Sequence, residues 1–405
     1  MVKSRKRKRN KLILAGLLLA AGHTAMGQET GNKCYYNTHF SLSQSNFVDT
    51  IPILYKENQI YIEATIEGKT YLLNLDTGSS QGVLYEGGRI PHSQPLGYIN
   101  TRDANGHTGN TPVVSFPTLQ IGHLRIDNYH GTLVQRPAGR YPYDGIIGFD
   151  LFNKGLQAKI DARKGYLILT DKKNFFDRES GFNMKYKLRR WVPYLLINTF
   201  EKHEEPTLFD TGSEDFFTFN KQSFDTERYK SARVVSLIEE TTNGQQTIGN
   251  FGAERSDLLF YIKLKRMWWG KFCFLNVHTY TSQGDSRLGG EVLKYGAVVI
   301  NPQRKLLKFQ PYIATDHVSV DNRLMDITYV PINGRAAVGT IRHRSRQYKQ
   351  GFRQGDAIIS INGTPINTFD DFQNYHFVKG ERYVFRLHSL RGFDKEVTVE
   401  RWGEE

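Results

Sequence analysis

Short apolar runs alternate with turn-forming residues along most of the chain. Runs rich in Val, Ile, Leu, Tyr and Phe occupy residues 60–66, 71–75, 112–116, 156–160 and 166–169, and Gly, Asn, Asp and Pro separate them. This spacing is typical of short strands joined by hairpins. The pattern predicts a mainly β protein, and the 22 Tyr and 25 Phe residues favour the same fold class.

The order of these runs repeats within the chain. Residues 59–85 and 193–219 each contain a strand-like run, a turn, a second apolar run, the tetrapeptide Asp-Thr-Gly-Ser and a further apolar run. A glycine-bounded block follows in each case, at 148–155 and at 289–296, and leads into another apolar stretch. A repeat of this kind indicates one structural unit that occurs twice.

An Asn-Gly dipeptide lies between the two motifs in each copy, at 105–106 and at 243–244. Asn-Gly is the strongest two-residue hairpin signal, so each dipeptide predicts a hairpin tip. Because the order of motifs is the same in both copies, we interpret residues 51–180 and 181–312 as two homologous β-lobes.

The N-terminal end has a different pattern. Residues 1–11 are strongly basic, residues 12–22 are apolar, and Ala25 and Gly27 then place small residues at the two positions that signal peptidase reads. This order is typical of a secretory signal peptide cleaved after Gly27, with an uncleaved anchor as the alternative. The apolar run is too short to span a bilayer. We therefore expect export to the periplasm or outside the cell, no stable membrane span after cleavage, and a mature chain that begins with an N-terminal segment, residues 28–50.

Charge and cysteine content exclude several other classes of protein. The net charge of +13 falls to +6 without residues 1–11, so we expect no nucleic-acid partner. Export makes a disulfide between Cys34 and Cys273 chemically possible, but the sequence leaves their pairing open. Two cysteines without zinc-ligand spacing, and no His-Glu-x-x-His motif, predict no metal and no cofactor.

Two aspartates in equivalent loops can form one catalytic site. Like charges held close together cannot both ionise easily, so such a pair shares one proton. The ionised member can take a proton from water while the protonated member polarises a carbonyl. The candidates are Asp76 and Asp210, each preceded by an apolar strand-like run that would fix its loop.

The residues after each aspartate are of types that suit such a site. Glycine lets the backbone turn tightly and approach the carboxylates. Threonine hydroxyls can brace the two loops, and serine hydroxyls can orient the outer carboxylate oxygens. The residues concerned are Thr77, Gly78, Ser79, Thr211, Gly212 and Ser213.

These motifs resemble those of pepsin-like and retropepsin-like aspartic peptidases over residues 51–312. The family's supporting motif of two apolar residues and glycine is present at 146–148, whereas 287–289 departs from it with an arginine. The resemblance implies a bilobal acid-protease fold, aspartic endopeptidase activity on protein or peptide substrates, and a monomer. It also implies a hairpin that closes over the substrate, with Asn105 and Gly106 as candidate tip residues.

The last part of the chain, residues 326–402, resembles the small α+β PDZ domains attached to bacterial peptidases. Residues 351–363 carry the resemblance, together with an expected helix at 369–377 and closing strands at 382–387 and 395–400. We expect residues 313–325 to be a polar connector.

The PDZ-like resemblance implies that a peptide adds as a strand beside Ala336, Val338 and Ile341. The alternative is that this domain serves only packing or stability. For the whole chain two functions stay open. One is a secreted aspartic endopeptidase, and the other is a non-catalytic extracytoplasmic peptide-binding protein on the same scaffold.

Overall fold

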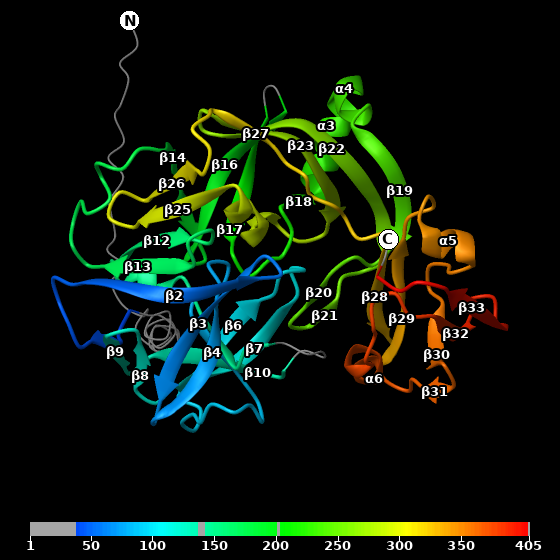
Figure 1. The fold of residues 1–405 in the computed structure, drawn as a ribbon, viewed down its shortest axis with the longest axis horizontal. Helices are drawn as coiled ribbons and strands as arrows, with labels where there is room; N and C mark the ends of the chain where they lie inside the picture. Colours follow the sequence, from blue (N-terminus) through cyan, green and yellow to red (C-terminus); the bar gives the residue numbers. More distant parts are fainter. Residues whose placement is uncertain (1–37, 137–141, 201–202, 404–405) are drawn as a thin grey trace, which may run out of the picture.

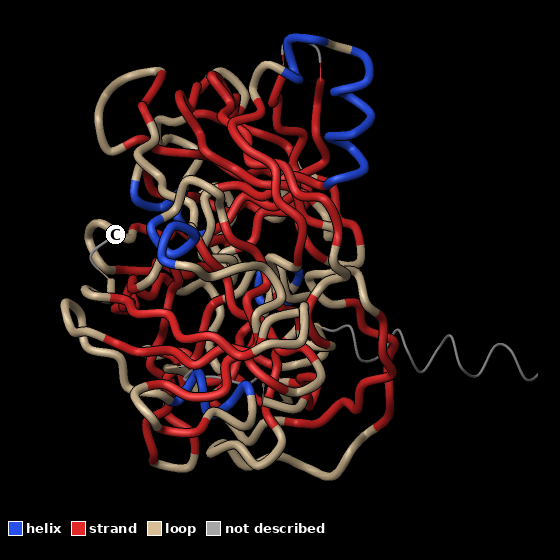
Figure 2. The backbone as a smooth tube through the Cα atoms, turned by 90° about the vertical axis from the view of Figure 1, so that its right-hand side faces the viewer, coloured by secondary structure: helices blue, strands red, loops and turns tan. Residues whose placement is uncertain are grey.

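The structure, a computed structural model, describes residues 38–136, 142–200 and 203–403. Its fold is mainly β, as predicted, and Figure 2 shows strands along most of the chain and only short helices. The predicted signal peptide and Cys34 lie outside the described residues. The described helices are α2 (Asp150–Asn153), α3 (Lys221–Lys230), α4 (Ala232–Val235), η1 (Gly290–Lys294), α5 (Arg346–Gln350) and α6 (Phe369–Asn374). No helix of the described part is long and apolar enough to cross a membrane.

Three groups of strands follow one another along the chain. The first half, residues 38–180, contains β1 (Ser41–Leu42), β2 (Val48–Lys56), β3 (Gln59–Ile66), β4 (Lys69–Leu75), β5 (Gly82–Tyr85), β6 (Gly97–Arg102), β7 (Thr108–Ser115), β8 (Leu119–Ile121), β9 (Leu124–Asp127), β10 (His130–Val134), β11 (Gly145–Ile147), β12 (Gln157–Asp161) and β13 (Tyr166–Thr170). The second half, residues 181–325, contains β14 (Phe182–Lys185), β15 (Lys187–Arg189), β16 (Val192–Phe200), β17 (His203–Asp210), β18 (Phe217–Asn220), β19 (Ile238–Gly244), β20 (Ile248–Gly249), β21 (Gly252–Ala253), β22 (Asp257–Trp269), β23 (Phe272–Ser282), β24 (Ser286–Gly289), β25 (Gly296–Asn301), β26 (Leu306–Pro311) and β27 (His317–Ser319). The C-terminal module, residues 326–403, contains β28 (Ile327–Ile332), β29 (Arg335–Ile341), β30 (Ala357–Ile361), β31 (Thr364–Pro365), β32 (Tyr383–His388) and β33 (Asp394–Val399).

The strands of the two halves are paired in the same way. The order is β3-β4-β11-β5-β10-β7-β6 in the first half and β16-β17-β24-β18-β23-β22-β19 in the second. In each half the strand that leads to Asp-Thr-Gly-Ser runs parallel to the strand that leads to the glycine block. The sequence repeat therefore corresponds to a repeated topology.

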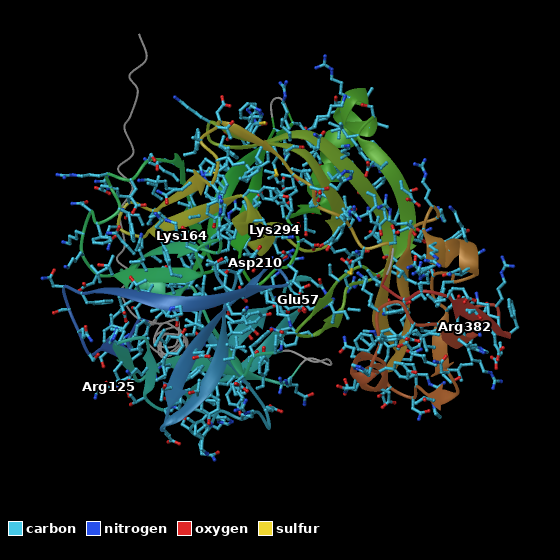
Figure 3. All side chains as sticks on the ribbon, in the orientation of Figure 1. Glu57, Arg125, Lys164, Asp210, Lys294 and Arg382 are labelled. Carbon is cyan, nitrogen blue, oxygen red and sulfur yellow. The ribbon has the colours of Figure 1, made fainter. Side chains whose placement is uncertain are left out.

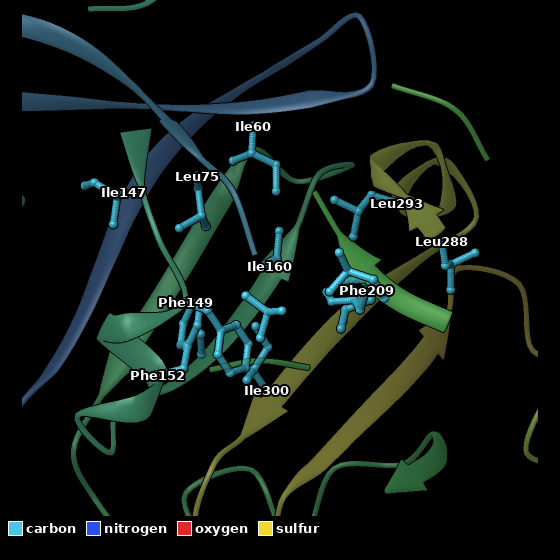
Figure 4. Packing of buried hydrophobic residues seen from close by; sticks show 14 of the residues in the cluster. Ile60, Leu75, Ile147, Phe149, Phe152, Ile160, Phe209, Leu288, Leu293 and Ile300 are labelled. Carbon is cyan, nitrogen blue, oxygen red and sulfur yellow. The ribbon is translucent and has the colours of Figure 1, made fainter. Parts of the chain in front are cut away.

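A shared sheet joins the halves. Strand β12 pairs antiparallel with β25, and the order β14-β26-β25-β12-β13-β2 takes strands from both halves (Figure 1). The apolar core is continuous across this junction, and Figure 4 shows Ile160 and Ile300 of the shared sheet in the same cluster as Leu75 and Phe209. Full burial of such a side chain contributes about 1.5–3 kcal/mol. The floor beneath both aspartate loops is thus one packed unit.

The C-terminal module has its own sheet, in the order β28-β29-β30-β32-β33, and its own apolar cluster. The two closing strands predicted from the sequence are confirmed as the antiparallel pair β32–β33. The predicted helix at 369–377 is shorter, because Tyr375 is already extended at its C-terminal end. Thr368 and Asp371 form a capping box at its start.

Residues 313–325 are not the simple connector that the sequence predicted. Strand β27 lies within them and pairs in parallel with β23. Asn322 is 5% exposed, accepts from the N–H of His278 (2.9 Å) and donates to its carbonyl (2.6 Å). The segment covers an edge of the second half, where unpaired strand groups would otherwise face water.

The hairpin tip predicted at Asn243 and Gly244 is wrong. Both residues belong to β19 and pair with Leu258 and Asp257 of β22. The chain makes a further excursion through β20 and β21 before it returns. Gly244 has φ = 144° and lies so close to the carbonyl of Gly339 that no side chain fits there. Packing against the C-terminal module, not a turn, requires this glycine.

Candidate active site

Asp76 follows directly after β4, whose last apolar residues Leu73 and Leu75 are fully buried. The N–H of Asp76 donates to the carbonyl of Ile147 at the end of β11 (3.0 Å). In the second half, Asp210 ends β17, lies in register beside Gly289 of β24, and follows the fully buried Phe209. Two equivalent strand ends therefore carry the two aspartates, and Figure 3 shows Asp210 near the middle of the molecule.

The threonines of the two loops hold each other. The N–H of Thr77 donates to the hydroxyl of Thr211 (3.0 Å), and the N–H of Thr211 donates to the hydroxyl of Thr77 (3.0 Å). The Thr77 hydroxyl donates to the carbonyl of Phe209 (2.7 Å), and the Thr211 hydroxyl donates to that of Leu75 (2.6 Å). Both threonines are fully buried, so any unpaired group left here would cost about 1–3 kcal/mol. This reciprocal network fixes the spacing of the two loops.

The glycines bring each loop close to the opposite carboxylate. A Cβ atom added to Gly78 would lie 2.5 Å from Cγ of Asp210, and one added to Gly212 would lie 2.5 Å from Cγ of Asp76. Each carboxyl group thus occupies the space that a side chain on the opposite loop would need. Only glycine is compatible with this approach.

The two carboxyl groups lie close enough to affect each other's ionisation. Backbone N–H groups of Gly78 (2.7 Å) and Ser79 (3.1 Å) donate to Oδ1 of Asp76, and that of Gly212 donates to Oδ1 of Asp210 (3.1 Å). Burial and then the nearby charge of Asp210 raise the pKa of Asp76 well above its usual range. Asp76 therefore keeps its proton at pH values where an isolated aspartate is ionised.

The serine side chain of the first loop does not have the predicted contact. The Ser79 hydroxyl donates to the carbonyl of Gln81 (2.7 Å), whereas its backbone N–H contacts the carboxylate. In the second loop the carbonyl of Ser213 accepts from the N–H of Gly290 (2.8 Å). The prediction for the Ser79 hydroxyl is wrong because the tight turn places backbone N–H groups nearer to the carboxylate.

Asn105 and Gly106 lie in the turn that joins β6 and β7, as predicted, and Gly106 has φ = 86°. The Asp103 carboxylate accepts from the N–H groups of Asn105 (3.0 Å) and His107 (2.8 Å), which shapes the tip. The tip reaches the second half, where Arg287 Nη1 donates to the carbonyl of Ala104 (3.3 Å). The hairpin therefore extends from one half to the other.

The three residues predicted to bind a peptide in the C-terminal module are buried. Ala336, Val338 and Ile341 are at most 2% exposed and belong to β29, which lies between β28 and β30. An added strand needs a free edge, and β29 has neighbours on both sides. This prediction is wrong, and the edge strand at that side of the sheet is β28.

Two residues near the aspartates were not identified from the sequence. Gln59 donates from Nε2 to the carbonyl of Gly212 (2.6 Å), so a strand of the first half supports the loop of the second. Arg287 is only 7% exposed although it is charged. Its position in an otherwise apolar motif was the available signal, whereas Gln59 gave none.

No group of three or more His, Cys, Asp or Glu side chains within the described ranges is placed to hold a metal ion. No protein-family model matches the chain, and no curated protein matches it. Among solved structures, an aspartic proteinase from Irpex lacteus is similar over 67% of this chain and 100% of that chain, with 12% sequence identity and a TM-score of 0.42. A likeness this weak does not define the activity.

Proposed function

We propose that the chain is a secreted aspartic endopeptidase of bilobal, pepsin-like or retropepsin-like organisation, with Asp76 and Asp210 as its catalytic pair. The observation that carries the proposal is the reciprocal approach of the two loops. Each glycine faces the opposite carboxylate, and the nearby carboxyl group of Asp210 helps to raise the pKa of Asp76. This arrangement differs from a structural ion pair, because it places two groups of like charge close together.

The chemistry follows from one proton shared by two carboxyl groups. The ionised carboxylate takes a proton from a water molecule, whose oxygen attacks the scissile carbonyl carbon. The protonated carboxyl group gives its proton to the carbonyl oxygen. The carboxyl group that took the water proton then protonates the amine nitrogen, and the C–N bond breaks. A hydroxyl of the intermediate gives its proton to the other carboxylate, so that the pair again holds one proton. The backbone N–H groups on Oδ1 of each aspartate keep both carboxylates oriented during these transfers.

The other parts of the chain have supporting roles in this proposal. The hairpin β6–β7 covers the substrate, and the C-terminal module is a PDZ-like domain that recruits or positions substrate. The chain is exported by its first 27 residues, acts as a monomer outside the cytoplasm of a bacterium, and needs no cofactor.

Proteolysis by the mature chain, residues 28–405, tests the proposal. Purified protein should cleave casein, and pepstatin should inhibit the cleavage. Asp76→Asn and Asp210→Asn should each lower the rate by at least about 10³-fold, and the double variant should be scarcely worse, because residues that act as one unit are non-additive. Asp127→Asn, at the end of β9 and away from both loops, is the matched control and should keep the wild-type rate.

Folding of each variant is checked by circular dichroism and thermal unfolding. Near-wild-type turnover by one folded single variant would show that the aspartates are not a catalytic pair. A wild type that binds extended peptides but does not cleave them would favour the non-catalytic peptide-binding protein.

A further inference from the structure

The tip of hairpin β6–β7 is bonded to residues 245–254 of the second half, which we call the latch ribbon. The Thr247 hydroxyl donates to Oδ1 of Asn105 (2.6 Å). The Asn105 amide in turn donates to the carbonyls of Thr247 (3.3 Å) and Gly252 (3.1 Å). Asn105 is only 6% exposed, so its whole amide is used in this junction.

Further contacts surround this junction. The N–H of Phe251 donates to Oδ2 of Asp103 (3.0 Å), and the Phe251 ring lies against Gly109, where an added Cβ would come within 2.6 Å of it. Gly284 approaches the carbonyl of Ala104 too closely for any side chain. The hairpin tip therefore fits a surface of the second half that is complementary in both shape and hydrogen bonding.

The junction is linked to the strand beside Asp210. Arg287, which donates to the carbonyl of Ala104 in the tip, stands two residues before Gly289 on β24. Gly289 is the register partner of Asp210. The hairpin tip thus contacts the second half on β24, the strand that pairs with the strand carrying Asp210.

The latch ribbon is an ordered element held by a buried carboxylate. Glu254 is 2% exposed and accepts from the N–H groups of Gln246 (2.8 Å), Thr247 (3.2 Å) and Gln283 (3.1 Å). Charge-assisted hydrogen bonds of this kind are stronger than neutral ones. A displacement of residues 245 and 246 is therefore transmitted to the residues that contact the hairpin tip.

The opposite side of the latch ribbon is bonded to the C-terminal module. The N–H of Gln245 donates to the carbonyl of Gly339 (3.1 Å), and the Thr328 hydroxyl donates to the carbonyl of Gln245 (3.2 Å). The fully buried Thr340 donates to Oε1 of Gln246 (2.5 Å). Figure 1 shows β20 and β21 between the hairpin β6–β7 and strands β28–β29.

We propose that residues 245–254 latch the hairpin tip against the second half, and that the C-terminal module controls this latch and with it access to Asp76 and Asp210. The module is then a regulatory element of the site and not only a tether for substrate. Regulation of the site rests on the proposed function of the aspartate pair. The mechanical link between the module and the hairpin does not depend on that function.

Hydrogen exchange of the mature chain without substrate tests the link. Thr247→Val removes the hydroxyl bond to Asn105, and Thr340→Val removes the hydroxyl bond to Gln246, each with little change of side-chain shape. Amide exchange in residues 101–112 should become roughly tenfold faster in both variants. Thr118→Val, which removes a hydroxyl–carboxylate bond of the same 2.6 Å length within the first half, and Thr364→Val, exposed on the module, are controls and should leave it unchanged.

Access to the aspartates is measured by the association rate of pepstatin, which is followed by tryptophan fluorescence. This association rate should rise in Thr247→Val and in Thr340→Val. If pepstatin does not bind the wild type, the proposed function fails while the exchange result still stands. Thr340→Val with wild-type exchange at 101–112 would overturn the role of the module. If Thr340→Val does not fold, Thr328→Val breaks the neighbouring contact and decides the same question.

Discussion

The two halves are alike at the aspartate loops and differ in the strands beside them. Both loops have the same threonine network and the same approach of glycine to carboxylate. By contrast, Ile146 of the first half corresponds to Arg287 of the second, which reaches the hairpin tip. The halves are equal where the two carboxylates are supported, and they differ where each half meets a different neighbour.

The two Asn-Gly dipeptides also differ because of their neighbours. Gly106 lies at a hairpin tip, as its local sequence predicts, whereas Gly244 lies inside β19. The second half packs here against the C-terminal module, and Gly244 lies directly against Gly339 of that module. A local turn signal is reliable only where no tertiary contact requires the same residue type.

Among the changes that compare the two halves beyond the aspartates themselves, the largest effect should come from Gly78 and Gly212. Gly78→Ala and Gly212→Ala each push a methyl group into the opposite carboxylate. We expect each to lower the cleavage rate by about 10²-fold, because displacement of a catalytic group by 1 Å can cost that much. Overpacking should also lower the free energy of unfolding by about 1–3 kcal/mol. Casein cleavage and urea unfolding measure the two effects.

Gly87→Ala is the matched control for these variants. Gly87 has φ = 65° and open space around it, so alanine meets only backbone strain, about 1 kcal/mol. Its cleavage rate should stay near that of the wild type. If one of Gly78→Ala and Gly212→Ala lowered the cleavage rate much less than the other, the two loops would not be equivalent.

An intermediate effect is expected from the acids that follow the two glycine motifs, Asp150 and Glu291. Burial raises the pKa of Asp150 to about 7, against an ordinary value of 3.8, although Tyr129 donates to its carboxylate (2.7 Å). Burial also raises the pKa of Glu291, but there Lys294 lies 3.0 Å away and favours the charged form. The first acid is therefore the more costly one to ionise.

The sign of the pH effect follows from the direction of the shift. Between about pH 4 and pH 7 the folded protein holds a proton on Asp150 that the unfolded chain releases, so stability falls as pH rises through this window. Asp150→Asn removes this pH-dependent contribution to the free energy of unfolding, which amounts to at most about 4 kcal/mol. The melting temperature of Asp150→Asn minus that of the wild type should therefore be larger at pH 8 than at pH 4. The same difference for Glu291→Gln should increase less between these two pH values. A difference that does not change with pH would contradict the assignment.

The sequence predicted the elements that are repeated or that depend on local chemistry. The two Asp-Thr-Gly-Ser loops and the strands before them could be predicted because a repeated motif is visible without any knowledge of contacts, and the tip at Asn105 because Asn-Gly is a local turn signal. The hydroxyl of Ser79 was misassigned because the choice between side-chain and backbone donors depends on a turn geometry that the sequence does not display.

Other features could not be predicted because they depend on contacts between distant segments. Strand β27 pairs with β23 across more than forty residues of chain, and its sequence reads as polar. The peptide-binding residues assigned to β29 were wrong because strand order within a sheet, and hence which strand is the edge, is not written in the local pattern. Arg287 could be noticed as unusual but not explained until its partner in the hairpin was known.

The smallest effect is expected from removing residues 313–324 in addition to the C-terminal module. One truncation ends after Tyr312 and the other after Leu324, which packs against Tyr261 and Tyr280. Both keep the two aspartate loops and should stay β-rich and cleave short peptides. The shorter protein loses β27 and the two hydrogen bonds between Asn322 and His278, and each such bond contributes about 1 kcal/mol. Its melting temperature should be lower by about 2–4 °C for each kcal/mol lost.

Hydrogen exchange makes this comparison sharper. Neither truncated protein has the C-terminal module, so exchange at residues 101–112 should be equally fast in both and faster than in the mature chain. If residues 313–324 were only a connector, the two melting temperatures would be equal. If exchange at the hairpin were slow in the longer truncation and fast in the shorter one, β27 and not the module would hold the latch ribbon in place. Strand β27 would act through β23, which pairs with β22 next to the end of the ribbon.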